Sequence, residues 1–404
     1  MDVTMRGLRI ALTVVLLAFV FAETIGQNAT PKVVILSFGA GGNVENLLGG
    51  MLNTLQSYGL VSEEERLLVQ SGEDISGEYL QISRSASDFD FPTAALMVQN
   101  TLDEEPDVIV ALTTPVAQLV VSATSDMDDP PIVLFGLVFD PYEAGVVQSS
   151  CIKPDHVWGV ESITPYEEVL PMMLSHFPDV NTLGIIFSSG EAAGLLGAQR
   201  IRKAAELLSL KVVDAGVAHP GEVRPASLGL IEKGADALIG TPDYVTGLSL
   251  PAIVSVANDN SIPVFHPTFI AALPALGAAT VSAGFGEYHQ QGVFLGAMLA
   301  AHLQGNADLR SSGIKSISSV LVAVNLDSAE MQDAEITQDL MAQADAIVKD
   351  GNVQWSARAL GMLARSSVIV DEEQRRAIDR AFLESIHCSP DMIAEQQAAL
   401  EASE

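Results

Sequence analysis

A strand-like apolar run that ends in Thr-Pro and opens into a helical pattern occurs twice in this chain. The longer copy runs from Asp107 to Pro115 (DVIVALTTP) and the shorter one from Asp236 to Pro242 (DALIGTP). After each helical pattern comes an apolar strand that contains a proline, at 131–135 and at 262–265. A helix that begins where a strand ends leaves its first backbone N–H groups unpaired, as an anion site requires. The repeat therefore predicts two α/β lobes that face one ligand across a cleft.

The length and composition agree with two lobes and restrict the partners. A chain of 404 residues exceeds what one core usually serves, and 48% apolar residues are enough to bury two cores. Asp and Glu number 51 against 20 Lys and Arg, which gives a net charge of −31. Because such a field repels nucleic acid and anionic lipid headgroups, we expect neither as a partner. We interpret the acidity as a solvated coat that keeps the protein soluble.

The N-terminus has the pattern of a secretory signal. Arg6 and Arg9 precede the apolar run from Ile10 to Phe21, and Ala22 provides a small residue for cleavage. The run is short for a membrane span, and no later stretch is long and apolar enough to cross a bilayer. We therefore expect residues 1–22 to be a signal peptide and the protein to be exported, periplasmic or extracytoplasmic. An uncleaved anchor remains the alternative.

The chain has two cysteines, Cys151 and Cys388. Export makes a disulfide between them chemically permissible, and this bond would tie the C-terminal segment to the middle of the chain. Two free thiols are equally compatible with the sequence, because a large domain does not need a covalent crosslink.

Strands and helices are expected to alternate strictly along most of the chain, which implies parallel sheets with helices on both faces. The predicted fold class is α/β, with two doubly wound parallel-sheet lobes joined by a multi-strand hinge. The break at Asp140-Pro141 is taken as the first crossing between lobes. The expected organisation is lobe 1 at 32–140 plus 267–318, lobe 2 at 141–266 plus 319–350, and a helical C-terminal tail without strands at 351–404.

Enzyme motifs are not supported. Gly39-x-Gly41 follows the first strand but lacks the third glycine of a dinucleotide site, since Val44 stands there, so a tight turn at the cleft edge is the better interpretation. The chain has neither a nucleophile elbow nor a phosphate-binding loop, and its seven histidines lack metal-ligand spacing. We expect no catalytic residue, no metal and no cofactor.

Polar residues at the ends of the repeated strands are the first candidates for ligand contacts. Thr113, Thr114 and Thr241 could hold a carboxylate, although capping of the following helices would also explain them. Asp140 and Asp243 could receive an ammonium group, and Asp243 could equally complement a helix dipole.

Further candidates lie at other predicted strand ends. Ser188 and Ser189 could contact the ligand or cap a helix, and His266 could be a ligand contact or a hydrogen-bonded structural histidine. Gly39 stands at the cleft-edge turn. Phe38 and Tyr244, with Phe139 and Phe285, gather near strand ends in a chain that is only 5% aromatic, which favours an apolar or aromatic ligand.

With these segments in view, the chain resembles the ABC transporter substrate-binding proteins of the tryptophan/tyrosine-binding type, which have the type I periplasmic-binding fold. The resemblance extends over about 32–350. It rests on the segments 33–38, 107–115, 131–141, 157–160 (VWGV), 183–187 (LGIIF), 236–243 and 324–329 (VNLDSA). It implies a receptor that captures a small solute and delivers it to a membrane permease driven by a separate ATPase. It also implies carboxylate contacts at Thr113 and Thr114.

We therefore expect an extracytoplasmic solute-binding protein of an ABC importer, without enzymatic activity. Its partners would be a small carboxylate-bearing solute and an ABC permease, and the protein is expected to be a monomer. An amino acid with an aromatic or branched apolar side chain is favoured, captured by hinge closure of two lobes. The alternative is a ligand-sensing receptor for a signalling partner; a hydrolase or isomerase is disfavoured by the missing motifs.

Overall fold

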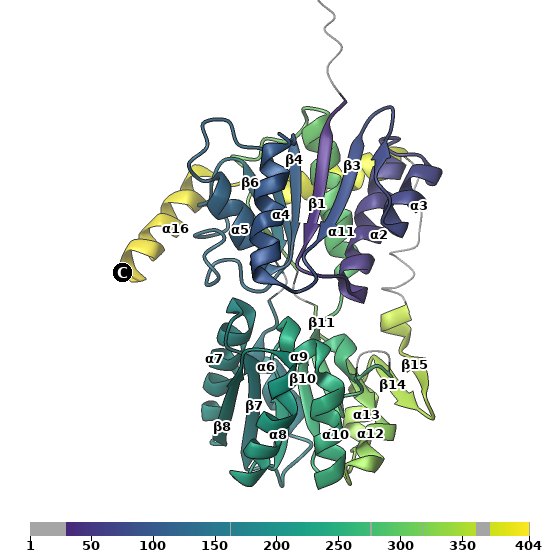
Figure 1. Ribbon diagram of the computed structural model, residues 1–404, viewed down its shortest axis with the longest axis vertical. Coiled ribbons are helices and arrows are strands. Elements are labelled where there is room, and N and C mark those ends of the chain that lie inside the picture. Colours follow the sequence, from purple (N-terminus) through teal and green to yellow (C-terminus); the bar gives the residue numbers. More distant parts are fainter. Residues whose placement is uncertain (1–29, 162, 275–276, 318, 361–371, 404) are drawn as a thin grey trace, which may run out of the picture.

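The protein consists of two α/β lobes stacked along its long axis (Figure 1). The structure, a computed structural model, describes residues 30–161, 163–274, 277–317, 319–360 and 372–403. The expected signal peptide at 1–22 lies outside the described residues. Each lobe is built on a mostly parallel sheet with helices on both faces, so the predicted fold class is confirmed.

Lobe 1 is built on a seven-stranded sheet. Its strands are in the order β12 (Lys315–Ser316), β6 (Val157–Glu161), β5 (Ile132–Val138), β4 (Val108–Leu112), β1 (Lys32–Ser37), β3 (Gln81–Ala86) and β2 (Ile75–Ser76). Neighbouring strands pair in parallel except β2 with β3. All five residues of β4 are buried, because helices cover both faces of the sheet and leave no polar side to the strand.

The helices of lobe 1 pack in two layers. One face carries α2 (Gly42–Ser57), α3 (Glu63–Ser71) and α11 (Tyr288–Leu303), and the other carries α4 (Phe91–Asp103) and α5 (Thr114–Thr124). The helix α3 was not predicted, although Ser62 and Glu65 form a capping box at its start, which is a readable signal.

Lobe 2 is built on an eight-stranded sheet. Its strands are in the order β15 (Asn352–Trp355), β14 (Ala346–Lys349), β13 (Leu321–Asn325), β11 (Val281–Phe285), β10 (Val264–Thr268), β9 (Ala237–Gly240), β7 (Thr182–Ser188) and β8 (Lys211–Val217). Around it lie α6 (Tyr166–Leu174), α7 (Ala192–Leu207), α8 (Val223–Glu232), α9 (Tyr244–Leu248), α10 (Leu250–Asn260), α12 (Leu326–Met331), α13 (Gln338–Gln343) and the short helices η1 (Pro220–Glu222) and η2 (Phe269–Ala272).

The expected lobe boundaries were wrong at two strands. The strand β6 pairs with β5 in lobe 1, whereas we expected lobe 2 to begin at residue 141. The strand β11 pairs with β10 and β13 in lobe 2, whereas 267–318 was assigned to lobe 1. Both strands are fully buried, and a fully buried strand looks the same in the sequence whichever sheet it joins. Between β5 and β13 the chain therefore passes from one lobe to the other after β6, after β11 and after β12.

The segment after β13 also differs from the expectation. After β13 the chain forms α12 and α13 and then the strand β14. The tail expected to lack strands begins with β15, which pairs with β14 in an antiparallel hairpin. Asp350 and Gly351 form the turn, both with positive φ (51° and 72°), as a two-residue hairpin turn requires. The Asp-Gly pair was the signal for this hairpin.

The helices α2 and α11 pack closely, and their contact positions two ends that face the other lobe. A Cβ on Gly292 would overlap the backbone carbonyl of Leu47, and one on Gly50 would overlap that of His289. Only glycine allows this close approach of two helix backbones. As a result, the N-terminus of α2 and the first residue of α11, Tyr288, reach the same opening between the lobes.

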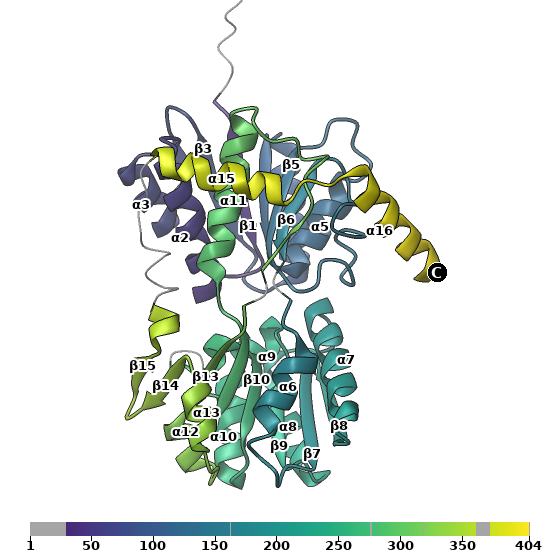
Figure 2. The same ribbon diagram turned by 180° about the vertical axis from the view of Figure 1, so that it is seen from behind.

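The C-terminal segment returns from lobe 2 to lobe 1 (Figure 2). The helix α15 (Glu372–Ser385) buries Phe382 in the lobe 1 core, where its ring contacts the rings of Trp158 and Phe294. The last helix, α16 (Pro390–Ser403), is anchored by Gln396, whose side chain accepts hydrogen bonds from Ser149 Oγ (2.6 Å) and the Cys151 N–H (2.8 Å).

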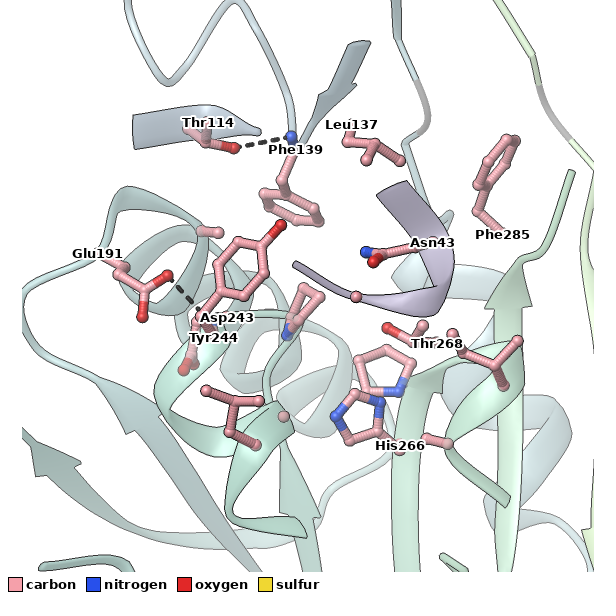
Figure 3. A pocket seen from close by; sticks show the side chains of 18 of the residues that line it. Asn43, Thr114, Leu137, Phe139, Glu191, Asp243, Tyr244, His266, Thr268 and Phe285 are labelled. Atoms are coloured by element: carbon pink, nitrogen blue, oxygen red, sulfur yellow. Dashed lines mark hydrogen bonds between the residues drawn. The ribbon is translucent and has the colours of Figure 1, made fainter. Parts of the chain in front are cut away.

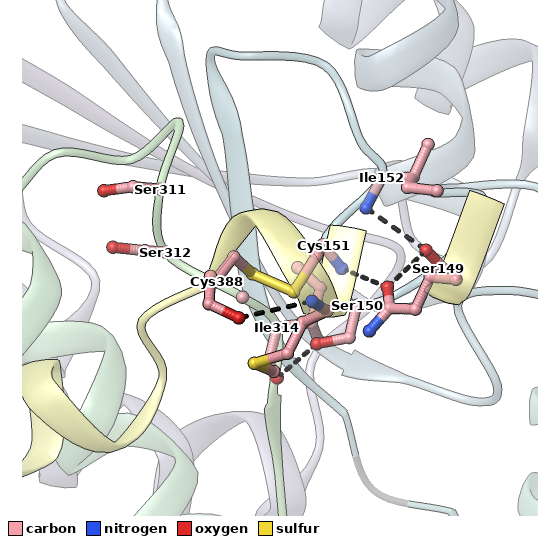
Figure 4. Close-up of a disulfide and its surroundings, with 12 residues drawn as sticks. Ser149, Ser150, Cys151, Ile152, Ser311, Ser312, Ile314 and Cys388 are labelled. Atoms are coloured by element: carbon pink, nitrogen blue, oxygen red, sulfur yellow. Dashed lines mark hydrogen bonds between the residues drawn. A yellow bond between two sulfur atoms is a disulfide. The ribbon is translucent and has the colours of Figure 1, made fainter. Parts of the chain in front are cut away.

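A disulfide between Cys151 and Cys388 fixes this segment to lobe 1 (Figure 4). The sequence left the pairing open, and the structure forms it. Backbone hydrogen bonds from Gly313 to Ile386 (2.6 Å) and from Cys388 to Ser311 (2.7 Å) surround it. The helical part of the tail, residues 372–403, is therefore covalently attached to lobe 1.

Candidate ligand-binding site

A cavity of about 220 Å³ lies between the lobes, at the carboxyl ends of the strands (Figure 3). Residues from lobe 1, from the hinge and from lobe 2 line it together. Of the predicted site residues, Thr114, Asp243, Tyr244 and His266 line the cavity. The lining does not include Phe38, Gly39, Thr113, Asp140, Ser188, Ser189 and Thr241.

The N-terminus of α2 forms one wall of the cavity in lobe 1. Residues 40–43 line the cavity, and the N-cap residue Gly41 provides no side-chain cap. Asn43 Oδ1 accepts the N–H of Val44 (3.0 Å). Gly39, which was the predicted contact at this turn, lies against the Phe89 ring and does not line the cavity, whereas the four residues after it do. The uncapped helix start presents donors and a positive dipole end to the cavity.

The first Thr-Pro copy contributes Thr114 at the start of α5. Its Oγ1 accepts the backbone N–H of Phe139 (3.0 Å), and its hydroxyl proton remains available for donation. Thr113 occupies the N-cap position with φ 86° but makes no capping hydrogen bond through its side chain, and it is fully buried behind the cavity wall. Simple capping therefore does not explain this threonine pair.

The second copy is organised differently from the first. The short helix α9 begins after Asp243, which is its N-cap and accepts the N–H of Thr246 (2.8 Å). The Asp243 carboxylate also accepts the N–H of Ser188 (3.0 Å) and the hydroxyl of Thr241. Burial raises the pKa of Asp243. Protein donors surround this carboxylate, which acts at the start of α9 as the helix-dipole interpretation expected, and its contact with a ligand ammonium group stays a prediction. Thr241 donates to Asp243 instead of capping a helix.

The two serines predicted after β7 also serve lobe 2 internally. Ser188 is 1% exposed, and its backbone N–H is bound to Asp243. Ser189 donates from its N–H (2.9 Å) and from its Oγ (3.2 Å) to the carbonyl of Val217.

Glu191, which the sequence analysis missed, is the carboxylate that lines the cavity beside Asp243. It is 2% exposed, and it accepts the N–H groups of Tyr244 (3.0 Å) and Val245 (3.2 Å) at the start of α9. Burial, together with the nearby charge of Asp243, raises the pKa of Glu191 to about 7, although the two backbone hydrogen bonds oppose this shift. A buried carboxylate at a ligand cavity is suited to pair with a cation.

Asp140 joins the two lobes through an ion pair instead of facing the cavity. Its carboxylate accepts hydrogen bonds from Arg200 on α7 and from the N–H groups of Tyr142 (3.2 Å) and Glu143 (3.0 Å). The guanidinium of Arg200 also lies 5.7 Å from the centre of the Phe139 ring. The expectation that Asp140 receives an ammonium group was wrong, because a cation of the other lobe already occupies it.

We expect Arg200→Gln to loosen the contact between the lobes. The change leaves the buried carboxylate of Asp140 without its cation, a loss of about 2 kcal/mol of stability. The radius of gyration of the unliganded protein, measured by small-angle X-ray scattering, should increase. Arg202→Gln is the matched control, because Arg202 lies on the same helix but pairs with Asp214 within lobe 2. An unchanged radius for Arg200→Gln would contradict the assignment.

Aromatic side chains enclose the cavity and connect the lobes. Tyr244 of lobe 2 inserts between lobe 1 rings, with its ring centre 5.7 Å from that of Phe38 and 5.1 Å from that of Phe89. Phe38 is therefore behind the cavity wall. Phe139 and Phe285, both noted in the sequence, line the cavity.

Other lining residues were missed by sequence reasoning. They include Asn43, Phe89, Leu137, Glu191, Thr268 and Tyr288. Most stand within a few residues of a strand end or a helix start, which was the available signal. Which of these ends meet at the cavity depends on the packing of the two lobes.

Within the described ranges, three or more His, Cys, Asp or Glu side chains do not gather as they would around a metal ion. None of the helices in those ranges is both long enough and apolar enough to span a bilayer.

Comparisons with known proteins agree with this architecture. The family model described as ABC transporter substrate binding protein matches residues 70–348. A tyrosine-binding protein of Clostridioides difficile is 28% identical over 188 residues, which cover 46% of this chain and 53% of that protein. The chain thus matches only about half the length of this curated relative.

Solved structures show the same fold. A conserved domain protein from Vibrio cholerae has a TM-score of 0.68 at 24% identity, covering 79% of this chain and 100% of that one. An ABC domain from Streptococcus pneumonia in complex with L-Trp has a TM-score of 0.68 at 20% identity, with the same coverage.

Proposed function

The chain belongs to the family of ABC transporter substrate-binding proteins, and on that premise we propose that it captures an α-amino acid with a large apolar or aromatic side chain between its lobes. It would then deliver this ligand to a membrane permease. Members of this family work outside the cytoplasm, and the Cys151–Cys388 disulfide is compatible with an oxidising compartment.

The observation that carries the proposal is the opposite electrostatic character of the two cavity walls. Lobe 1 presents the uncapped N-terminus of α2 and the hydroxyl of Thr114, which suit a carboxylate. Lobe 2 presents Glu191, whose carboxylate has acceptor positions beyond the two N–H groups it binds. Figure 3 shows Asn43, from the α2 start, and Glu191 on different sides of the pocket. A zwitterion would bridge these walls, so binding would favour closure of the lobes.

The remaining lining supports the choice of side chain. Leu137, Phe139, Ile270 and Phe285 provide an apolar surface that a ring or a branched chain would fill. The name of the Clostridioides difficile relative, a tyrosine-binding protein, points to the same ligand class.

Thermal unfolding with a panel of L-amino acids tests the proposal. A ligand present at 100 times its dissociation constant stabilises the folded protein by about 2.7 kcal/mol. L-Trp, L-Tyr, L-Phe and L-Leu are the principal probes. N-acetyl-L-tryptophan, which lacks the ammonium group, and tryptamine, which lacks the carboxylate, are the matched controls. Stabilisation by an amino acid but by neither control is the expected result, and no shift with any amino acid would overturn the proposal.

A further inference from the structure

His266 is buried at the end of β10, where it lines the cavity on the lobe 2 side (Figure 3). It is 3% exposed, and neither Nδ1 nor Nε2 has a hydrogen-bond partner. Among the described residues that line the cavity, only His266 has buried side-chain polar atoms without a hydrogen-bond partner. Buried polar groups in folded proteins are nearly always paired, so an unpaired pair of ring nitrogens at a ligand cavity requires an explanation.

The backbone around His266 holds the ring in place without satisfying it. A Cβ on Gly240 would lie 3.1 Å from Cδ2 and 3.4 Å from Nε2, so the glycine makes room for the imidazole against β9. The backbone of Thr241 lies near the imidazole and favours its protonated form, which opposes the effect of burial. Neither ring nitrogen makes a hydrogen bond to it. The protein thus positions the ring and leaves its nitrogens unused.

Burial keeps this ring uncharged. It lowers the pKa of His266 to about 4, so at neutral pH the imidazole has one N–H donor and one acceptor nitrogen. An uncharged ring has no particular advantage for a carboxylate or an ammonium group, which have better partners at the α2 start and at Glu191. Leu250, Ile270 and Ala271, which line the same cavity, are apolar, as expected where a ligand side chain is accommodated.

We propose that His266 is a specificity-determining residue that recognises an O–H or N–H group on the ring of the ligand side chain. This inference rests on the proposed amino-acid ligand. The cavity would then prefer an amino acid whose ring carries a polar hydrogen to one with a plain hydrocarbon ring. In Figure 3, His266 and Thr268 lie on one side of the pocket and Glu191 on another, so one ligand could reach Glu191 with its ammonium group and His266 with its ring.

Isothermal titration calorimetry with L-Tyr, L-Trp and L-Phe tests the inference on the full-length protein. The wild type should bind L-Tyr or L-Trp at least about tenfold more tightly than L-Phe, because L-Phe leaves the imidazole unpaired. In His266→Leu this preference should disappear while L-Phe binding is retained or improved. His266→Gln, which keeps a donor and an acceptor, should restore part of the preference.

Each result decides between defined alternatives. Equal affinity of the wild type for all three amino acids would overturn the role of His266 and leave the proposed function intact. Persistence of the wild-type preference in His266→Leu would overturn it as well. No binding of any amino acid by the wild type would instead remove the proposed function. Thermal unfolding of unliganded His266→Leu checks folding, and we expect no loss of stability because the variant no longer buries an unpaired polar ring.

Discussion

Replacing Glu191 with glutamine is expected to weaken amino-acid binding about 100-fold, because the ligand ammonium would lose a buried charged partner worth about 3 kcal/mol. Glutamine has nearly the same shape, so the cavity should keep its size. The dissociation constant for the tightest amino acid, measured by calorimetry at pH 8, checks the prediction. Indole-3-propionate, which has no ammonium group to pair with Glu191, should bind the variant no more weakly than it binds the wild type.

The stability of the unliganded protein should not fall in Glu191→Gln, although amino-acid binding does. The pKa of Glu191 is raised from 4.5 to about 7 in the folded protein, mainly by burial. The resulting stabilisation is fully present below pH 4.5 and is lost as the pH rises towards 7, so above pH 7 the charged side chain costs the unliganded fold about 3 kcal/mol. Glutamine removes this cost but can accept only one of the two N–H groups that Glu191 holds. The unliganded variant should therefore be at least as stable as the wild type at pH 8.

Binding should also depend on pH. The ammonium ligand requires ionised Glu191, so affinity should be highest above pH 7 and should fall about tenfold per pH unit below it. This dependence should be absent in Glu191→Gln. Glu206→Gln is a matched control, because Glu206 is exposed on α7, the helix that begins directly after Glu191. A Glu191→Gln protein that binds as tightly as the wild type would exclude Glu191 as the ammonium partner.

The sequence predicted the two α/β lobes and some of the strand ends that border the cavity. Apolar runs punctuated by Gly and Pro located most strands, since a buried parallel strand has a continuous apolar signature. Thr114, Asp243, Tyr244 and His266, all expected as ligand contacts, line the cavity, because the carboxyl ends of the strands in each sheet meet at one edge.

The roles of the acidic residues could not be predicted in the same way. Asp140 and Glu191 are both acids that follow a strand, and what separates them is a distant partner. Asp140 pairs with Arg200, which is 60 residues away in the sequence, whereas Glu191 borders the cavity. Similarly, β6 and β11 were assigned to the wrong lobes because sheet membership depends on long-range pairing. Local pattern predicts an element, while tertiary packing decides what it contacts.

Removing the disulfide by Cys151→Ser and Cys388→Ser is expected to lower the free energy of unfolding by about 5 kcal/mol. The two cysteines are 237 residues apart, so the bond closes a loop that contains all of lobe 2. In the chain-entropy description, such a crosslink stabilises by restricting the unfolded chain, and its effect grows with the logarithm of loop length. Equilibrium unfolding in urea at neutral pH, without ligand, measures the change.

The two tryptophans allow each lobe to be followed separately. Trp158 is buried in lobe 1, where its indole N–H donates to the Gly313 carbonyl (2.8 Å), and Trp355 lies on β15 of lobe 2. Trp158→Phe and Trp355→Phe backgrounds therefore report one lobe each. Without the disulfide, the urea midpoints reported by both tryptophans should fall. The midpoint reported by Trp158 should fall further, because Phe382 of the tail packs against this ring.

The contacts around the disulfide give this experiment a clear alternative outcome. The tail also buries Phe382 and Ile386 in the lobe 1 core and hydrogen-bonds through Gln396. If these contacts alone hold the tail, the cysteine-free protein should unfold at the wild-type midpoints, and the crosslink would be dispensable for stability. Wild-type protein treated with a reductant is the control, since it loses the bond without a change of side chain. Agreement between reduced wild type and the double variant would attribute the loss to the crosslink itself.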